Sequence, residues 1–282
     1  MDGSARAPAA GTVLNALATG TGAAFAIDEY VTATVALDPS TTGVTGRITD
    51  APTADTTLIE TAVTHVLEAI DVAAGATVET TSDIPMASGL KSSSAAANAT
   101  VLATLSAADA TMDRETAAKI GVAAAREAGV TVTGAFDDAA ASMLGGVVVT
   151  DNDAHDLLHH DTFDAAVLVW TPPARAYSVD APVEQCRRVA GVADHVRDLA
   201  LDGRYPLAMT INGLAFSAAL DYDPVPILEA LPHAAGATLS GTGPSVIAVG
   251  DRDSLRPVAD RWADREGDTW MTTTQQTGAT TI

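Results

Sequence analysis

The 282-residue sequence contains one cysteine, Cys186, and no long apolar run. One cysteine excludes an internal disulfide framework, and we expect Cys186 to be a small buried hydrophobe. No segment approaches the ~20 apolar residues that a membrane-spanning helix needs. Residues 1–20 also lack the basic start and apolar block of a secretion signal. These absences favour a cytoplasmic protein with no membrane partner.

Basic residues are also scarce. Two lysines (Lys91 and Lys119) and thirteen arginines face 36 acidic residues, so the formal net charge is −21. Sequence-independent nucleic-acid binding relies on Lys and Arg that neutralise phosphates, so we expect no nucleic-acid partner. Self-repulsion of this size weakens a compact fold in dilute salt, whereas molar salt shortens the Debye length to about 3 Å. The composition therefore predicts a halophilic protein from a salt-rich cytoplasm, the alternative being an ordinary acidic protein.

Hydrophobic residues make up 47% of the chain, enough for one large core or two smaller ones. Periodicity predicts strands at 31–37, 76–81 and 165–170, a turn and strand from 145, and a strand–glycine turn–strand unit at 237–250. It predicts helices at 54–74, 92–107 and 113–128, with Asp113 as a cap, and two more from about 182 and 206. The polar segment 151–161 is the best candidate for a domain junction. These patterns indicate a mixed α+β chain with two lobes, residues 1–155 and 156–282.

The stretch "DIPMASGLKSSSAAANA" (83–99) carries the most chemical information. Gly89 permits backbone conformations that other residues avoid, and three serines then open a small-residue helix. The first turn of a helix has free N–H groups and a positive dipole end, which favour an anion. Lys91 adds a positive charge beside that position. The stretch predicts a phosphate-binding loop, the alternative being a capped core helix behind a loop.

Other nucleotide-binding motifs are missing. No G-x-x-x-x-G-K-[ST] string occurs, and Gly20–Gly22 lacks the third glycine of G-x-G-x-x-G. "SGTGPS" (240–245) is a second candidate phosphate-facing loop, although taken singly it is equally typical of a tight turn between strands.

At this point a resemblance to a known family becomes specific. "PMASGLKSSSAAANA" (85–99) resembles the second motif of the GHMP kinase superfamily, and "LSGTGPSVIAV" (239–249) resembles its third. Within that superfamily, "AAGTVLNALATGTGAAFAID" (9–28) and "TVTGAFDDAAASMLGG" (131–146) resemble the archaeal shikimate kinases. The resemblance implies a two-lobed fold, with an N-terminal lobe like ribosomal S5 domain 2 and a ferredoxin-like C-terminal lobe, and ATP and Mg²⁺ between them.

The resemblance also implies which residues contact ATP. The phosphate loop comprises Pro85, Ala87, Ser88, Gly89, Leu90, Lys91, Ser92, Ser93, Ser94 and Ala95, with Gly241, Thr242, Gly243 and Ser245 closing the site from the other lobe. Ser93 matches the serine that approaches Mg²⁺. The first motif has no lysine here, so Lys91, Mg²⁺ and backbone N–H groups would have to stabilise the transferring phosphoryl group.

"GAFDDAAAS" resembles the family segment that holds a catalytic aspartate followed by Asn. Asp137 falls on the aspartate and Asp138 on the Asn. An aspartate there accepts the proton of the substrate hydroxyl or orients that hydroxyl. Neighbours on a helix point about 100° apart, so we expect only one of the two to face the site. Asp137 is the first choice, Asp138 is the second, and a structural helix cap is the alternative to both.

The remaining assignments are weaker implications of the resemblance. Glu127 lies near the position of a second Mg²⁺ ligand, or is a solvated helix residue. Asn15, Thr19 and Thr21 match substrate-hydroxyl contacts, or form a structural turn. The shikimate carboxylate needs an arginine or backbone N–H groups, and the sequence does not identify which.

Two further patterns are set aside. "SGLK" (88–91) satisfies S-x-x-K of serine acyl-enzymes, but the companion S-D-N and K-T-G strings are missing. His155 and His159 are four residues apart, as in helical metal sites, but no Glu or Cys ligand is close in sequence and a solvated acidic loop is the simpler interpretation.

Together these observations predict an enzyme that transfers phosphate from ATP to shikimate, for aromatic amino-acid biosynthesis. Homoserine kinase or another GHMP small-molecule kinase is the alternative among enzymes. A non-catalytic GHMP-fold protein that binds a small molecule is the alternative from another class, although it would not need Asp137 and Ser93.

The charge balance generates the first testable prediction. The refolding yield and the free energy of unfolding should rise steeply between dilute buffer and molar KCl, because added salt screens the repulsion among 36 acidic side chains. Denaturant titrations at several KCl concentrations would measure this dependence. A stability independent of KCl would contradict the halophilic interpretation.

Overall fold

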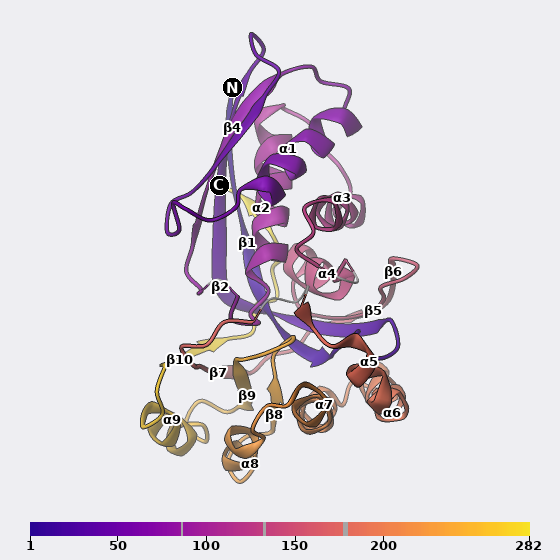
Figure 1. The fold of residues 1–282 in the computed structure, drawn as a ribbon, viewed down its shortest axis with the longest axis vertical. Helices are drawn as coiled ribbons and strands as arrows, with labels where there is room; N and C mark the ends of the chain where they lie inside the picture. Colours follow the sequence, from indigo (N-terminus) through magenta and orange to yellow (C-terminus); the bar gives the residue numbers. More distant parts are fainter. Residues whose placement is uncertain (86, 132–133, 177–179) are drawn as a thin grey trace.

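The computed structural model describes residues 1–85, 87–131, 134–176 and 180–282. These residues form two β-sheets, each with its own helices, stacked along the long axis of the molecule (Figure 1). The first sheet contains β1 (Asp2–Leu14), β2 (Thr21–Asp38), β3 (Val44–Ile48), β4 (Gly75–Ser82), β5 (Val147–Asp151), β6 (Asp156–Asp161) and β11 (Thr280–Thr281). The second contains β7 (Ala166–Thr171), β8 (Gly236–Leu239), β9 (Val246–Gly250) and β10 (Asp268–Thr273).

The helices form two groups (Figure 1). The first group, α1 (Thr57–Ala69), α2 (Ser92–Ala107), α3 (Arg114–Glu127) and α4 (Phe136–Leu144), packs on the first sheet. The second group is α5 (Val183–Cys186), a 3₁₀ turn (Arg187–Val189), α6 (Ala190–Leu201), α7 (Tyr205–Leu220), α8 (Val225–Ala230) and α9 (Arg256–Ala263). Helices α7, α8 and α9 contact the second sheet, whereas α6, and α7 in part, pack on the other face of the first sheet. The fold is therefore the mixed α+β, two-lobed arrangement predicted from the sequence.

Helix α2 is the centre of the first lobe. Nearly all of its residues after Ser94 are buried, and it contacts both β1 and β2. Its small side chains, mostly alanine, allow the helix to lie close to the sheet, and a helix that is apolar all round is one whose every face meets protein. The start of this helix, Ser92, is therefore fixed by the whole core of the first lobe.

Strand β2 connects the two lobes. Its first residues, Thr21–Phe25, pair with β5, and its later residues, Val31–Asp38, pair with β4. Between them Ile27 bridges to Thr274, just beyond the end of β10. The two sheets are thus joined by main-chain bonds at the middle of one long strand.

Most of the predicted elements are confirmed. Helix α2 spans the residues predicted for it, and α3 begins after Asp113, whose carboxylate accepts a hydrogen bond from Thr116 N at 2.9 Å. The predicted strand at 31–37 is the second half of β2, and the helix predicted at 54–74 is shorter, α1. Cys186 is fully buried, as expected, and burial raises the pKa of its thiol.

The polar segment 151–161 differs from its interpretation as a junction. Residues 156–161 form β6, which pairs with β5 as a hairpin of the first sheet. The boundary expected between residues 155 and 156 therefore falls inside that hairpin, and we propose that the lobes divide after Asp161. His155 lies on this turn and His159 on the strand, so their spacing of four residues does not place them on one helix face as in a helical metal site.

Strand β1 was not predicted, because its alanines and glycine lack the β-branched pattern of a strand. They are nonetheless buried, as a strand covered on both faces requires. Within the described residues, no helix combines the length and the apolar character needed to cross a membrane.

Candidate active site

The predicted phosphate loop lies at the start of α2. Three of its residues adopt left-handed backbone conformations: Ala87 (φ 57°), Gly89 (φ 87°) and Lys91 (φ 65°). Such conformations are costly for Ala and Lys and are held only where the surroundings fix them. Lys91 is the N-cap of α2 and makes no side-chain capping bond, so the N–H groups of the serine turn keep their capacity to bind an anion.

The phosphate loop docks on the second glycine-rich loop through main-chain contacts. Ser240 Oγ donates to Gly89 O at 2.9 Å, and Ser245 N donates to Ser88 O at 3.2 Å. A Cβ atom on Gly89 would lie 2.4 Å from Ser240 O and 2.8 Å from Gly243 O. Only glycine fits at this position, both for its φ and for the approach of the other loop.

Gly241 is held on the opposite side by the first strand and the turn after it. Its N–H donates to Thr12 Oγ1 at 2.8 Å, and its carbonyl accepts from Asn15 Nδ2 at 2.8 Å. The backbone N–H of Asn15 in turn donates to Asn212 Oδ1. Asn15 therefore acts here as a structural residue, although it also lines the small cavity described below.

A cavity of about 200 Å³ opens in front of the phosphate loop. Its polar end is formed by both loops and by α4, through Gly89, Lys91, Ser92, Ser93, Ser94, Asp138, Gly241 and Thr242. Its other end is apolar and is formed by the sheet and α1, through Val31, Ile48, Leu58, Ile59 and Val130. The cavity thus joins a polar end, which contains Lys91 and the serine turn, to an apolar end.

Lys91 and Asp138 form a buried ion pair at the polar end. Lys91 Nζ lies 2.9 Å from each oxygen of the Asp138 carboxylate and donates a hydrogen bond to Oδ2. Asp138 Oδ1 is buried and lies beside the Lys91 charge, but none of the described residues donates a directed hydrogen bond to it. A buried acceptor of this kind is stabilised by a ligand that donates one.

The surroundings of Asp138 disfavour its charged form. Burial and, to a smaller extent, the negative charge of Asp137 raise its pKa to about 7, and Lys91 opposes both effects. A carboxyl group that titrates near neutral pH is suited to exchange a proton at that pH.

Asp137 lies on the other side of the first turn of α4. Its Oδ1 accepts from Asn152 Nδ2 at 2.7 Å. Asp137 and Asp138 together line a small cavity of about 40 Å³ next to Lys91. From the sequence we expected only one of the two aspartates to face the site, but a cavity lying across the end of the helix is reached by both. The contact with Lys91 belongs to Asp138.

Several predicted site residues have structural partners instead of facing the cavities. Leu90, Ala95 and Ser245 are buried in the core, and Ser245 Oγ shares a hydrogen bond with Thr171 Oγ1 at 2.6 Å. Ser88 Oγ donates to Pro85 O, which closes the turn of the loop. The described linings of the two cavities do not include Pro85, Ser88, Leu90, Ala95, Gly243, Ser245, Thr19, Thr21 or Glu127.

Glu127 is not brought to the phosphate loop. Its side chain is 64% exposed and its Oε2 lies 2.9 Å from His65 Nε2, so it joins α3 to α1 on the surface. This environment is that of the solvated helix residue considered as the alternative. In the described part of the chain, no group of three or more His, Cys, Asp or Glu side chains could hold a metal ion.

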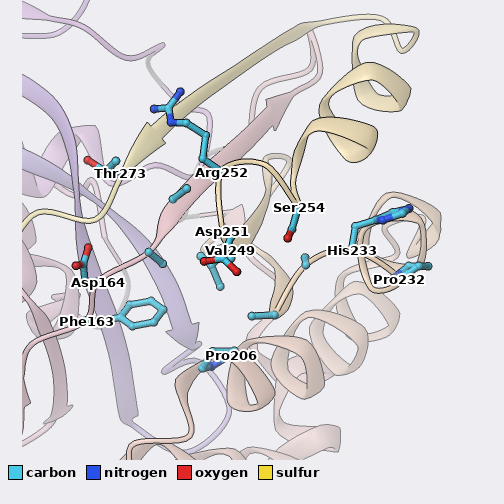
Figure 2. Close-up of a pocket in the computed structure, with 15 residues that line it drawn as sticks. Phe163, Asp164, Pro206, Pro232, His233, Val249, Asp251, Arg252, Ser254 and Thr273 are labelled. Carbon is cyan, nitrogen blue, oxygen red and sulfur yellow. The ribbon is translucent and has the colours of Figure 1, made fainter.

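A larger cavity, about 740 Å³, lies in the second lobe beside β7 and β9. Figure 2 shows that its charged side chains do not converge: Arg252 and His233 lie on opposite sides, and neither points at the other. It contains neither glycine-rich loop nor either aspartate of α4. Its size alone does not make it the candidate site.

Two parts of the site were missed from the sequence. The apolar end combines single residues from β2, β3, α1 and the segment after α3, which no local motif connects. Asn152 lies in a segment interpreted as a polar junction. The burial of Asn152 is what marks it as part of the site, and the sequence of a polar turn does not show which of its residues are buried.

Comparison with known proteins defines the class. Residues 57–146 match the family model described as the GHMP kinases N terminal domain. The structure resembles homoserine kinase from Cytophaga hutchinsonii, with a TM-score of 0.81 and 19% identity over 100% of this chain and 97% of that one. It also resembles the Methanococcus jannaschii mevalonate kinase, with a TM-score of 0.79 and 15% identity over 98% of each chain. The fold is that of a GHMP kinase.

Sequence comparison narrows this to one branch. Shikimate kinase of Halobacterium salinarum is 59% identical over the full length of both chains. Shikimate kinase of Methanothrix thermoacetophila is 51% identical over 95% of this chain and 92% of its own. The chain belongs to the archaeal shikimate kinase family of the GHMP superfamily. The haloarchaeal relative also fits the acidic composition.

The docking of the two loops generates a prediction for Gly89→Ala. The added methyl group requires an unfavourable φ and meets Ser240 O and Gly243 O, so both loops must move. We expect turnover to fall at least ~100-fold, since displacements of about 1 Å have that effect. Steady-state assays in molar KCl would measure it.

Gly129→Ala is the matched control, because Gly129 has φ 68° and nothing lies within 4 Å of the added methyl group. It should lose about 1–2 kcal/mol of stability from its φ alone and keep its activity. Equal activity losses in the two variants would show that the contact between the loops is not required.

Proposed function

We propose that this protein transfers the terminal phosphoryl group of ATP to the 3-hydroxyl of shikimate, a step of aromatic amino-acid biosynthesis. Family membership supports the reaction. The observation that supports its location is the Lys91–Asp138 pair beside the free first turn of α2. This arrangement places a cation, main-chain donors and a carboxylate around one cavity.

We propose that ATP occupies the 200 Å³ cavity along its length. The apolar end, with Val31, Ile48 and Leu58 among its lining residues, suits the adenine ring. The phosphates then lie at the start of α2, where the N–H groups of the serine turn and the charge of Lys91 stabilise them. The second loop closes the site through Gly241 and Thr242.

The donors in this cavity also fit Mg²⁺, which prefers oxygen ligands and keeps several waters and phosphate oxygens. Ser93 Oγ, on the exposed side of the first turn, would hold the ion together with the phosphate oxygens of ATP. The ion would supply charge neutralisation on the phosphates. Glu127, paired with His65 on the surface, is not needed for this arrangement.

We assign the hydroxyl proton to Asp138. Asp138 lines both cavities, its Oδ1 accepts no directed hydrogen bond from the described residues, and burial raises its pKa to about 7. A substrate hydroxyl that donates to Oδ1 is oriented for attack and loses its proton to the carboxylate as the new P–O bond forms. Lys91 then stays beside the phosphates, and Asp137 contacts the substrate from the small cavity.

Direct detection of phosphorylated product tests the proposed reaction. Purified protein with Mg-ATP in molar KCl should convert shikimate and leave homoserine unchanged, and Ser93→Ala should lose most of the turnover without unfolding. Coupling enzymes are avoided because they can fail in such salt. Turnover of homoserine alone would keep the class and overturn the substrate. No turnover from folded, ATP-binding protein would favour the non-catalytic alternative.

The aspartate assignment predicts a distinct pH dependence. The value of kcat/KM for shikimate should fall as pH drops below about 7, because protonated Asp138 cannot accept the hydroxyl proton. Asp138→Asn should remove this fall at low pH, the acidic limb of the pH profile, and lower kcat by about 10²–10⁴-fold. Asp137→Asn should keep the limb but move it to lower pH, because the Asp137 charge raises the pKa of Asp138.

The reversed result would return the role to Asp137, the first choice from the sequence. In that case Asp137→Asn would abolish the acidic limb, and Asp138→Asn would keep a slowed but titrating enzyme. Circular dichroism of both variants in molar KCl provides the folding control.

A further inference from the structure

Asn152 is a fully buried polar residue that the proposed mechanism does not use. It follows β5 in the turn toward β6, and its backbone N–H donates to Gly20 O at 2.9 Å, which anchors the turn to the start of β2. Its side chain reaches from this turn to the first turn of α4. A buried amide in such a place must satisfy its donors and acceptors within the protein.

The orientation of the amide follows from its partners. Asn152 Oδ1 accepts from the backbone N–H of Asp137 at 3.1 Å and from Thr150 Oγ1 at 2.7 Å. A backbone N–H can only donate, so the oxygen of the amide must face it. The NH₂ group is therefore the one that faces Asp137 Oδ1, at 2.7 Å.

These bonds fix Asp137 at both its main chain and its carboxylate. Ala135, the N-cap of α4, makes no side-chain capping bond, so Asn152 satisfies an N–H of the first turn from another part of the chain. On the other side, a Cβ on Gly22 would lie 2.5 Å from Asp137 Cγ and Oδ2. The carboxylate is thus confined between Asn152 and the bare backbone of β2.

We propose that Asn152 is a positioning residue, which holds the Asp137 carboxylate in the small cavity at a fixed distance from Asp138. The proposal rests on the proposed kinase reaction and adds the group that sets the geometry of the aspartate pair. A substrate contact from Asp137 needs this orientation, because a carboxylate without the Asn152 bond would rotate away from it.

The same bonds affect the proton acceptor. The charged groups that face Asp138 are Lys91 at the start of α2 and Asp137 on α4, and Asp55 also lines the 200 Å³ cavity. Asp137 raises the pKa of Asp138 and Lys91 lowers it. If Asp137 is released and moves away, the pKa of Asp138 falls, so the acidic limb of kcat/KM moves to lower pH.

The test uses full-length protein in molar KCl and a graded set of variants. Asn152→Asp removes the NH₂ donor at nearly the same volume, Asn152→Ala removes the whole contact, and Thr150→Val removes only the outer bond to Oδ1. Ser142→Ala is the control, because Ser142 is buried on the same helix and its Oγ has no partner among the described residues.

Asn152→Asp and Asn152→Ala should lower kcat by about 10- to 100-fold, with a smaller change in KM for ATP. Asn152→Ala, which adds no charge, should also move the acidic limb to lower pH. Thr150→Val should change kcat in the same direction but less, and it keeps the proposal testable if Asn152→Ala does not fold. Ser142→Ala should match the wild type. Variants of Asn152 that lose stability but keep kcat and the pH profile would show a helix cap only and overturn the proposal.

Carboxyl NMR separates this proposal from the proposed function. With ¹³C-labelled aspartate and Asp138→Asn for assignment, Asp138 should titrate at lower pH in Asn152→Ala than in the wild type. This readout does not need turnover, so it holds even if the wild-type protein fails to phosphorylate shikimate. An unchanged titration of Asp138 would contradict the positioning role directly.

Discussion

The contact of two glycine-rich loops at Gly89 is the constraint on which the site depends. The loops come from different lobes, and the main chain of one lies against the main chain of the other with no room for a side chain. This contact orients the start of α2 and places Gly241 beside Lys91. Left-handed residues on both sides of Gly89 are then held by the fold, so the anion-binding turn exists before any ligand arrives.

The electrostatics of the site differ from those of the surface. With a net charge of −21, the exterior relies on dissolved salt to relieve repulsion. Asp138 and Lys91 are nearly enclosed, with side-chain exposures of 10% and 11%, so mobile ions screen them much less. Burial and the neighbouring charges therefore set the pKa of Asp138, while the charges of the exposed carboxylates are screened by dissolved ions.

Features formed by contiguous residues could be predicted from the sequence, whereas features formed by residues far apart in the sequence could not. Helix α2 and the Asp113 cap follow from contiguous residues, and the structure confirms both. The roles of Asp137 and Asp138 do not, because the position of the cavity relative to α4 depends on the turn at Ala135 and on contacts with β2 and β5. Glu127 had a suitable sequence spacing, but the direction of α3 takes it to the surface beside His65. Strand β1 was missed because burial on both faces, not intrinsic propensity, makes alanine favourable there.

The course of β2 has a mechanical consequence. The strand belongs to the first sheet along most of its length, yet Ile27 bridges to Thr274 and Ala26 O accepts from Gln275 N at 2.9 Å. A rotation of one lobe against the other would break these main-chain bonds as well as those at Gly89. The lobes are therefore held to each other at two separate places, and both sets of bonds resist a rotation between them.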